Sequence, residues 1–390
     1  MRVDAFERRA RGDTLIEVKS TTTVKEEHIW DCAIQTWVAR GAGRKVDCVV
    51  LAHVNREFVY RREGDFRGLL TLQDITHEVE TKLPEIPRIV AKLKRVASGP
   101  VPDIRTGSHC LQPYECPCRS HCQTFELAPP AFPVDLLPHA ADLVDTLRAD
   151  GYLDLRKVPM DRLSNPRHLR IAQATRSGKP YVSPKLSAVL DALTFPRYYL
   201  DFETIAFVTP RWLGTRPFQQ VPFQFSCHIE AGKGTLHHRQ FLDLSGAAPM
   251  AGFVDALLDA VREKGPILVW NKSFEATRIK ELARMFPAQE VALHALIERM
   301  VDLLPIYREH YYHRDMRGSW SIKAVLPTVA PDLDYASLEI GDGDAAQAGY
   351  LSAIDANASE VERETVRLNL LAYCERDTLA MVRLARWRPT

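Results

Sequence analysis

The chain has 390 residues, of which 46% are hydrophobic and 26% are charged, a composition typical of a globular protein with two or three domains. Its net charge of +1 excludes a global basic field, so nucleic acid would have to be bound by local basic patches. No apolar run reaches the roughly 18–20 residues of a membrane helix, and no signal peptide is recognisable. We therefore expect a cytoplasmic protein without a membrane partner. In that compartment its eight cysteines are expected to be metal ligands or core residues.

The first 125 residues are predicted to form one α/β domain. Two strand-like segments joined by a turn at Arg11–Asp13 predict a hairpin over Met1–Ser20, and a mostly apolar segment predicts a buried strand over Val46–Val54. Apolar residues at helical spacing predict a helix over Glu26–Ala39 and a long helix over Asp74–Val96, which is interrupted near Pro84.

Four polar residues of this domain lie on consecutive elements. Asp4 lies on the first strand, Glu17 and Lys19 share one face of the second strand, and Gln35 lies on the following helix. From the residues alone, this pattern is also that of an amphipathic hairpin with exposed charges. The ordered set resembles the RecB-like branch of the PD-(D/E)xK nucleases, which have a restriction-endonuclease-like fold. The resemblance implies a catalytic site in which Asp4 and Glu17 hold Mg²⁺ and Lys19 orients or activates the attacking water.

The chain departs from that family at its N-terminal end. The family has a helix, a strand and a cysteine before the strand that carries the aspartate, whereas this chain begins almost at Asp4. We therefore expect a truncated domain in which one face of the sheet is poorly covered. The sequence leaves open whether this N-terminal nuclease domain is active or inactive.

Four cysteines occur within thirteen residues, at Cys110, Cys116, Cys118 and Cys122, a density that indicates a metal site in a cytoplasmic protein. The segment resembles the three-cysteine cluster of CRISPR-associated RecB-like nucleases. The resemblance implies a [4Fe–4S] cluster held by Cys110, Cys116 and Cys122 with a fourth cysteine from upstream, for which Cys118 or Cys32 is a substitute. The alternatives are Zn²⁺, held with the help of His109 or His121, and no metal.

Residues 126–194 are predicted to be a proline-rich and helical linker. The run from Ala128 to Pro138 holds four prolines and is not expected to form regular structure. Short helices are predicted over His139–Ala149 and Pro166–Arg176, and a third begins at Ser183 as its N-cap. The segment is rich in basic side chains, which are typical both of a surface that guides a nucleic-acid strand and of a solvated spacer.

Residues 195–390 are predicted to form a second α/β domain. Three strands of an antiparallel meander are expected over Tyr198–Leu200, Pro222–Glu230 and Thr235–Leu242. The remaining periodic segments are strands at Pro266–Trp270 and Met300–Leu304, and helices at Met250–Glu263, Glu275–Met285 and Val361–Trp387.

Carboxylates occur on three of these elements. Asp201 and Glu203 share one face of a strand, Glu275 opens a helix, and Tyr373 and Asp377 are four residues apart on the last helix. Two acids that face the same way in a core strand are costly to bury unless a cation lies between them. Four such carboxylates can hold two divalent ions. A solvated helix face is the alternative for the pair on the last helix.

This ordered set resembles the DEDD exonucleases of the ribonuclease H-like fold, in the subtype that uses a tyrosine. The resemblance implies that two Mg²⁺ or Mn²⁺ ions are held by Asp201, Glu203, Glu275 and Asp377, and that Tyr373 positions the attacking water. It also implies 3′–5′ hydrolysis of a single-stranded DNA or RNA end. The family has aspartate where this chain has Glu275. Asp302, at the end of the neighbouring strand, is an alternative to Glu275 as the acid at this place in the site.

Taken together, the two halves resemble a bacterial family of uncharacterised proteins that pairs a RecB-like nuclease domain with a DEDD-type exonuclease domain. That resemblance implies a nuclease. The alternative is a catalytically decayed protein that binds nucleic acid, or a scaffold in DNA repair or phage defence.

Overall fold

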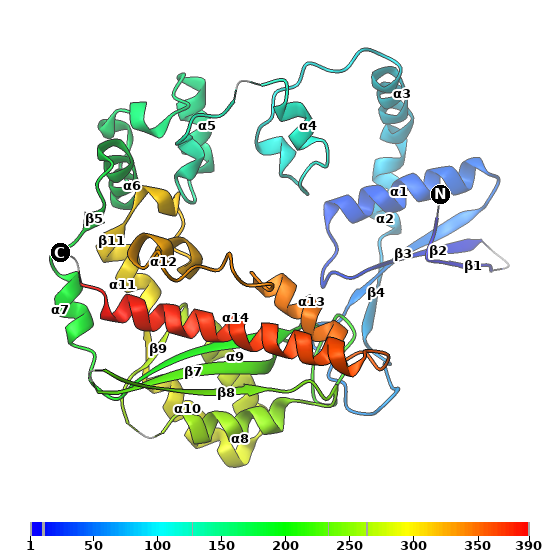
Figure 1. Cartoon of the computed structure of the whole chain (residues 1–390). Helices are drawn as coiled ribbons and strands as arrows, with labels where there is room; N and C mark the ends of the chain where they lie inside the picture. The colour runs from blue at the N-terminus through cyan, green and yellow to red at the C-terminus, as the bar shows by residue number, and fades with distance from the viewer. Residues whose placement is uncertain (1, 10–11, 127, 233, 263, 389–390) are drawn as a thin grey trace. The chain divides into compact units, whose positions relative to one another are not determined.

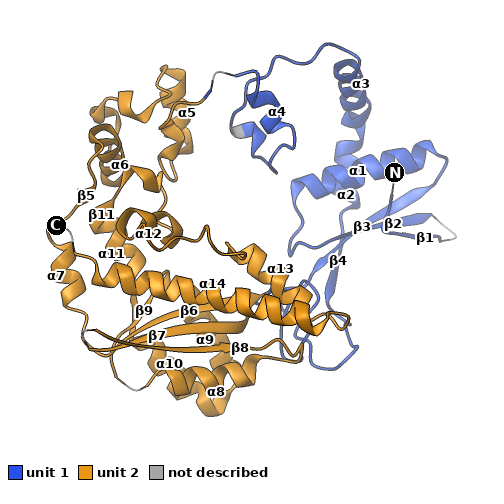
Figure 2. Ribbon diagram, viewed as in Figure 1, with its two compact units in different colours: residues 1–128, 206–219 blue, residues 129–205, 220–390 orange. Residues whose placement is uncertain are grey.

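The computed structural model describes residues 2–9, 12–126, 128–232, 234–262 and 264–388 of the chain. They form two compact units, shown in Figure 2: Met1–Ala128 with Ala206–Gln219, and Pro129–Ile205 with Gln220–Thr390. The predicted linker therefore lies in the second unit from Pro129 onward, and a short segment of the predicted C-terminal domain lies in the first. Within the described ranges, no helix is long and apolar enough to span a membrane.

The first unit contains a four-stranded sheet in the order β1-β2-β3-β4. The strands are β1 (Ala5–Glu7), β2 (Asp13–Lys19), β3 (Val46–Val54) and β4 (Leu70–Asp74). β1 and β2 form the predicted antiparallel hairpin, β2 and β3 are parallel, and β4 is antiparallel to β3. The hairpin is shorter than predicted, since Asp4 precedes β1 and Met1 lies outside the described residues.

Helices cover one face of this sheet. α1 (Glu26–Gly41) packs Cys32 and Ala33 against Leu15 of β2 and Leu51 of β3. The predicted long helix is divided, because a turn of 3₁₀ helix at Leu83–Glu85 separates α2 (Thr76–Lys82) from α3 (Ile86–Ala97).

The other face of the sheet is partly open. Val18 and Leu72 flank Ala52 in register on that face, and their exposed fractions are 40% and 66%. Such exposure agrees with the expected poor coverage of one sheet face.

The second unit is built around a five-stranded sheet in the order β10-β9-β6-β7-β8. The strands are β6 (Arg197–Ile205), β7 (Val221–Gly232), β8 (Thr235–Leu242), β9 (Ile267–Val269) and β10 (Met300–Asp302). β6, β7 and β8 form the predicted antiparallel meander, while β9 and β10 run parallel to β6.

The two faces of the meander differ in polarity. Phe202 and Phe225 are register partners on one face, and their rings pack at 5.0 and 5.4 Å from Phe253 of α8 (Met250–Ala260). Asp201 and Ser226 are register partners on the opposite face, because successive side chains of a strand alternate. The long helix α14 (Glu360–Arg386) contacts β6 and β7 over this polar face (Figure 1).

Among the described residues, eight more α-helices complete the second unit. They are α5 (Ala141–Ala149), α6 (Pro166–Ser177), α7 (Leu186–Asp191), α9 (Lys272–Met285), α10 (Glu290–Glu298), α11 (Leu303–His310), α12 (Ile322–Val329) and α13 (Gly343–Ala353). Leu147, Ile171 and Leu186 from the predicted linker are fully buried in one core with Tyr307 and Met381. The segment is thus part of the core, and its helices at 141–149 and 166–177 agree with the prediction to within two residues.

Candidate active site

A cavity of about 190 Å³ opens in the second unit where β6, α12 and α14 meet. The described residues that line it are Asp201, Phe202, Glu203, Trp270, Ile322, Lys323, Tyr373, Asp377 and Met381. Four of the five residues predicted for this site therefore surround one space, although 172 residues separate Asp201 from Tyr373 in the chain.

The helix that closes the cavity is fixed at its start and along its length. Ser359 is the N-cap of α14 and forms a capping box with Glu362. One turn separates Tyr373 from Asp377, so both side chains reach the cavity. Cys374 lies between them with its sulfur 3.8 Å from the carbonyl oxygen of Asp201. Burial raises the pKa of this thiol, so Cys374 packs against β6 as a neutral group.

Burial and mutual repulsion disfavour ionisation of the carboxyl groups in the cavity. Burial, followed by the charges of Asp377, Glu203 and Glu275, raises the pKa of Asp201 well above its usual range. Burial and the charge of Asp377 raise the pKa of Glu203 to about 8. The pKa of Asp377 itself is raised by burial to about 6. A bound cation would reverse these shifts, because it stabilises the ionised forms.

Two cavity neighbours oppose that repulsion. The Lys323 ammonium group donates to the carbonyl oxygen of Gly341 at 2.6 Å and to the hydroxyl of Tyr373 at 3.0 Å. Its charge lowers the pKa values of Asp201, Glu203 and Asp377. Tyr335 donates from its hydroxyl to Asp377 Oδ1 at 2.5 Å. Sequence reasoning missed Tyr335, which lies outside regular structure and carries no motif.

Glu275, the fifth predicted residue, does not line the cavity. It lies in the first turn of α9, only 1% exposed, and its Oε2 atom has no hydrogen-bond partner among the described residues. Burial raises its pKa to about 8. Its charge nevertheless reaches the cavity, because it is one of the causes of the raised pKa of Asp201.

The turn before α9 is shaped by two polar residues. Asn271 is the N-cap and has a φ of 87°, a left-handed conformation that asparagine tolerates better than most residues. Asp302 accepts hydrogen bonds from the backbone N–H groups of Asn271, Lys272 and Leu304 at 3.0–3.1 Å. Asp302 therefore fixes this turn and caps α11, and it is not a side chain that lines the cavity.

The predicted site of the first unit forms a separate polar cluster. Lys19 Nζ contacts Glu17 Oε1 at 2.8 Å and Asp31 Oδ2 at 2.6 Å, and Gln35 donates to Asp31 Oδ1 at 3.2 Å. Asp4 accepts a hydrogen bond from the backbone N–H of Val18 at 2.9 Å. Although burial alone would lower it, the hydrogen bonds to Asp31 and Glu17 raise the pKa of Lys19. Asp31, one turn before Gln35 on α1, was missed because its role depends on a partner from another element.

The clustered cysteines lie on short elements near the end of the first unit. Cys110 ends a 3₁₀ turn at Ser108–Cys110, Cys118 is the N-cap of α4 (Arg119–Gln123), and Cys122 lies on α4. All eight cysteines of the chain are free thiols. In the described part of the chain, no three of the clustered sulfurs lie within 4.8 Å of one another. The iron–sulfur cluster and the alternative Zn²⁺ site stay predictions. Cys32, the other cysteine considered for the cluster, is buried in the hydrophobic core between α1 and the sheet.

Comparison with known proteins gives a family match without an assigned activity. Residues 198–321, which include Asp201, Glu203 and Glu275, match a domain of unknown function (DUF2779). An uncharacterised protein of Mycoplasma pneumoniae is 28% identical over 269 residues, which cover 61% of this chain and 40% of the relative. Uncharacterised proteins of Ureaplasma parvum and Mycoplasma genitalium are each 25% identical and cover 48% and 52% of this chain. The chain matches 30% and 33% of their lengths, so it spans less than half of each relative. No solved structure matches the chain.

Proposed function

We propose that the second unit is a metal-dependent phosphodiesterase that hydrolyses DNA or RNA, with the 3′–5′ exonuclease chemistry that the motif resemblance implies. One observation carries the proposal: Asp201, Glu203 and Asp377 converge from two distant elements on a single cavity of about 190 Å³. Burying three carboxylates around one space is costly unless cations are bound there.

The donor set fits hard divalent cations. Carboxylate oxygens are the ligands that Mg²⁺ and Mn²⁺ prefer. Glu275, whose Oε2 has no hydrogen-bond partner among the described residues, adds a carboxyl group whose charge raises the pKa of Asp201. Asp201, Glu203 and Asp377 would hold the ions, with Glu275 adding negative charge nearby. Ions bound there would neutralise phosphate charge and lower the pKa of a bound water.

Tyr373 acts as a hydrogen-bond donor in this proposal. Burial and the charges of Asp377 and Glu203 raise its pKa, so the phenol stays protonated at neutral pH and is not a general base. Its oxygen already accepts from Lys323, which leaves its own proton for a water or a phosphate oxygen. Tyr373 thus positions the nucleophile, and Lys323 offers a cation to the phosphate.

The first unit is proposed to be a RecB-like nuclease-type domain of lower or absent activity. The ammonium group of Lys19 is bound by two carboxylates, so it is not poised to activate a water. The buried Oε2 of Glu17 and Oε1 of Gln35 have no hydrogen-bond partner among the described residues, and both are oxygens of the kind that Mg²⁺ binds.

A nucleic-acid-binding protein with a decayed site is the second candidate. The position of Glu275 favours it, since that carboxylate does not line the cavity. The two candidates differ in turnover, because both predict salt-dependent binding of nucleic acid but only the first predicts cleavage.

The test is cleavage of end-labelled single-stranded DNA and RNA with Mg²⁺ or Mn²⁺, and with EDTA as the metal-free control. We expect Asp377→Asn to lower cleavage by more than about 100-fold, since it removes a proposed metal ligand rather than an outer-shell partner. Asp332→Asn is the matched control, because Asp332 is an exposed acid that pairs with Arg383 of α14. Cleavage that survives in Asp377→Asn would falsify the assignment. Metal-independent binding without cleavage by the wild type would favour the second candidate.

A further inference from the structure

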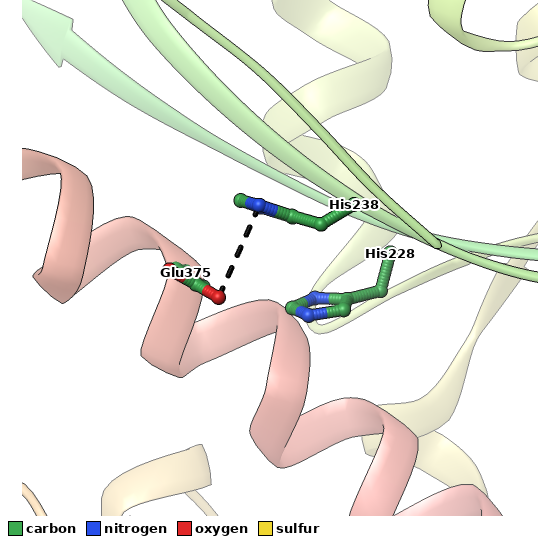
Figure 3. Close-up of side chains that lie close together, drawn as sticks. All are labelled: His228, His238 and Glu375. Atoms are coloured by element: carbon green, nitrogen blue, oxygen red, sulfur yellow. Dashed lines mark ion pairs between the residues drawn. The ribbon is translucent and has the colours of Figure 1, made fainter. Parts of the chain in front are cut away.

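A second group of metal-ligating side chains lies outside the cavity, between β7, β8 and α14. His228 on β7, His238 on β8 and Glu375 on α14 each offer one ligand atom, and these atoms lie within 4.8 Å of one another. The two histidines are register partners, with ring centroids 4.5 Å apart. Figure 3 shows the two imidazoles and the carboxylate brought together from the strands and the helix.

The tautomer of His228 follows from the requirement that every contact in a chain of hydroxyl groups is a hydrogen bond. Thr378 Oγ1 donates to the backbone carbonyl of Glu375 at 3.0 Å, and a carbonyl oxygen only accepts. Having used its proton there, Thr378 Oγ1 accepts from Ser226 Oγ at 2.7 Å and from His228 Nδ1 at 2.8 Å. The other ring nitrogen of His228, Nε2, therefore carries a lone pair.

The same chain fixes the proton on His238. Ser226 donates its only hydroxyl proton to Thr378, so it accepts from His238 Nε2 at 2.8 Å. The lone pair of His238 is thus on Nδ1, which lies 3.9 Å from Glu375 Oε1. Burial, followed by the charges of His238 and Arg386, lowers the pKa of His228 to about 4, and burial also lowers the pKa of His238. Both imidazoles are neutral at pH 7, the form that binds metals.

Two atoms with lone pairs therefore face each other without a proton between them. A distance of 3.9 Å is too long for a hydrogen bond. Zn²⁺ binds nitrogen and oxygen at about 2.0–2.2 Å, so two ligands of one tetrahedral ion are about 3.4 Å apart. Closing the gap needs only a small side-chain movement, and the half-exposed Glu375 side chain has room for it.

We propose that His228, His238 and Glu375 form a site for a divalent transition-metal ion of the Zn²⁺ type, with water completing the coordination. Two imidazoles and one carboxylate are ligands that Zn²⁺ prefers over Mg²⁺, in contrast to the carboxylates proposed to hold the ions in the cavity. Ser226 and Thr378 orient the imidazoles, as the outer hydrogen-bond partners of metal-bound histidines do.

The site has a structural consequence that does not depend on the proposed nuclease activity. An ion bound there would link α14 to β7 and β8, and α14 also carries Tyr373 and Asp377. Because the ion binds only the folded arrangement, it would stabilise the position of the helix over the sheet.

The test is Co²⁺ and Zn²⁺ binding to the full chain in excess Mg²⁺, which competes for the carboxylates of the cavity. Stoichiometry is measured by equilibrium dialysis and elemental analysis, and coordination by the visible d–d absorption of Co²⁺. We expect the wild type to bind one ion more than His238→Ala. His237→Ala is the matched control, since His237 is the preceding residue of β8 and is exposed on the other face. Any ion bound by the clustered cysteines is common to all variants and cancels in the difference.

Two further variants keep the proposal falsifiable if His238→Ala does not fold. Glu375→Gln changes a half-exposed ligand and should lose the same ion. Thr378→Val removes the tautomer lock and should weaken Zn²⁺ binding about 10–100-fold. Asp377→Asn should keep the ion while losing cleavage, which separates this site from the proposed active site. Equal ion content in the wild type, His238→Ala and Glu375→Gln, or equal loss in His237→Ala, overturns the proposal.

Discussion

The buried carboxyl of Glu275 should make the metal-free protein less stable as the pH rises. Glu275 is 1% exposed, and burial raises its pKa from an ordinary 4.5 to about 8. Asp302 adds to the rise, while Arg278 and the backbone N–H of Glu275 oppose it. Glu275→Gln removes the ionisation and keeps the shape of the side chain.

The direction of this pH dependence follows from proton linkage. Between about pH 4.5 and pH 8, folded Glu275 keeps a proton that the unfolded chain has released, so the free energy of unfolding falls with rising pH. Its contribution is fully present below the unfolded pKa and is lost as the pH rises through the folded pKa. A rise in pKa from 4.5 to about 8 corresponds to at most about 5 kcal/mol, at 1.36 kcal/mol per pH unit. Because structural relaxation and water entry reduce such penalties, we expect about 2–5 kcal/mol.

The assay is urea unfolding in EDTA at pH 5 and pH 9, followed by far-UV circular dichroism. Glu275→Gln should lose less stability than the wild type between these pH values, by about 2–5 kcal/mol. Any pH-independent change in the free energy of unfolding caused by replacing the carboxyl with an amide cancels in this difference. Glu290→Gln on α10 is the control, because its side chain is 54% exposed and the same charge change should leave the pH dependence unaltered. Identical pH dependence in wild type and Glu275→Gln would refute the reasoning.

Three other predictions concern the cavity and its supporting turn. Tyr373→Phe should lower kcat about 100-fold while Mn²⁺ affinity measured by calorimetry is unchanged, and weakened Mn²⁺ binding would contradict a positioning role. Tyr335→Phe removes the hydrogen bond that lowers the pKa of Asp377, so the acid limb of the pH–rate profile should move to higher pH; an unmoved limb would show that this hydrogen bond does not affect the ionisation of Asp377. Asn271→Ala should cost about 1–2 kcal/mol in urea unfolding because of the φ of 87°, whereas Asn271→Gly should cost less, and the reverse order would contradict the strain argument.

Elements with regular apolar periodicity could be predicted closely from the sequence. β3 at Val46–Val54 and β8 at Thr235–Leu242 have the predicted bounds. β3 is a short, mostly apolar run, which is the pattern of a buried strand. β6 is longer than predicted, since the strand continues through Asp201 and Glu203 to Ile205. Polar residues in a core strand have no apolar signal, and their strand conformation depends on pairing with β7.

Helix boundaries failed where distant residues decide them. α9 begins at Lys272, three residues before the predicted start at Glu275. Asp302 on β10 accepts from the backbone N–H groups of the turn before that helix, and no local pattern reveals this contact. The helix predicted over Met250–Glu263 ends at Ala260 as α8, and its predicted last residue lies outside the described residues.

The members of the predicted cavity could be named from motif order, but their supporting residues could not. Tyr335 and Asp31 form their contacts with Asp377 and Lys19 through the tertiary fold, and each is an ordinary residue in its own segment. Residues 126–194 were predicted to be a linker outside both domains for a related reason. Its prolines and basic residues dominate the pattern, although Leu147 and Ile171 at helical spacing are buried in the core.

The contacts of α14 explain why its buried position is hard to predict from the sequence. Polar contacts hold this helix over the sheet: Gln224 donates to the carbonyl of Leu370, Thr378 contacts Ser226, and Arg386 donates to the buried Glu230. Polar residues on the buried side of a helix give that part of its sequence the pattern of a solvated helix. Because buried polar groups must be matched one by one, the sheet face beneath α14 fixes both its register and the placement of Asp377. Residues of the proposed Zn²⁺ site and of the acidic cavity therefore lie on one helix, whose position both sites require.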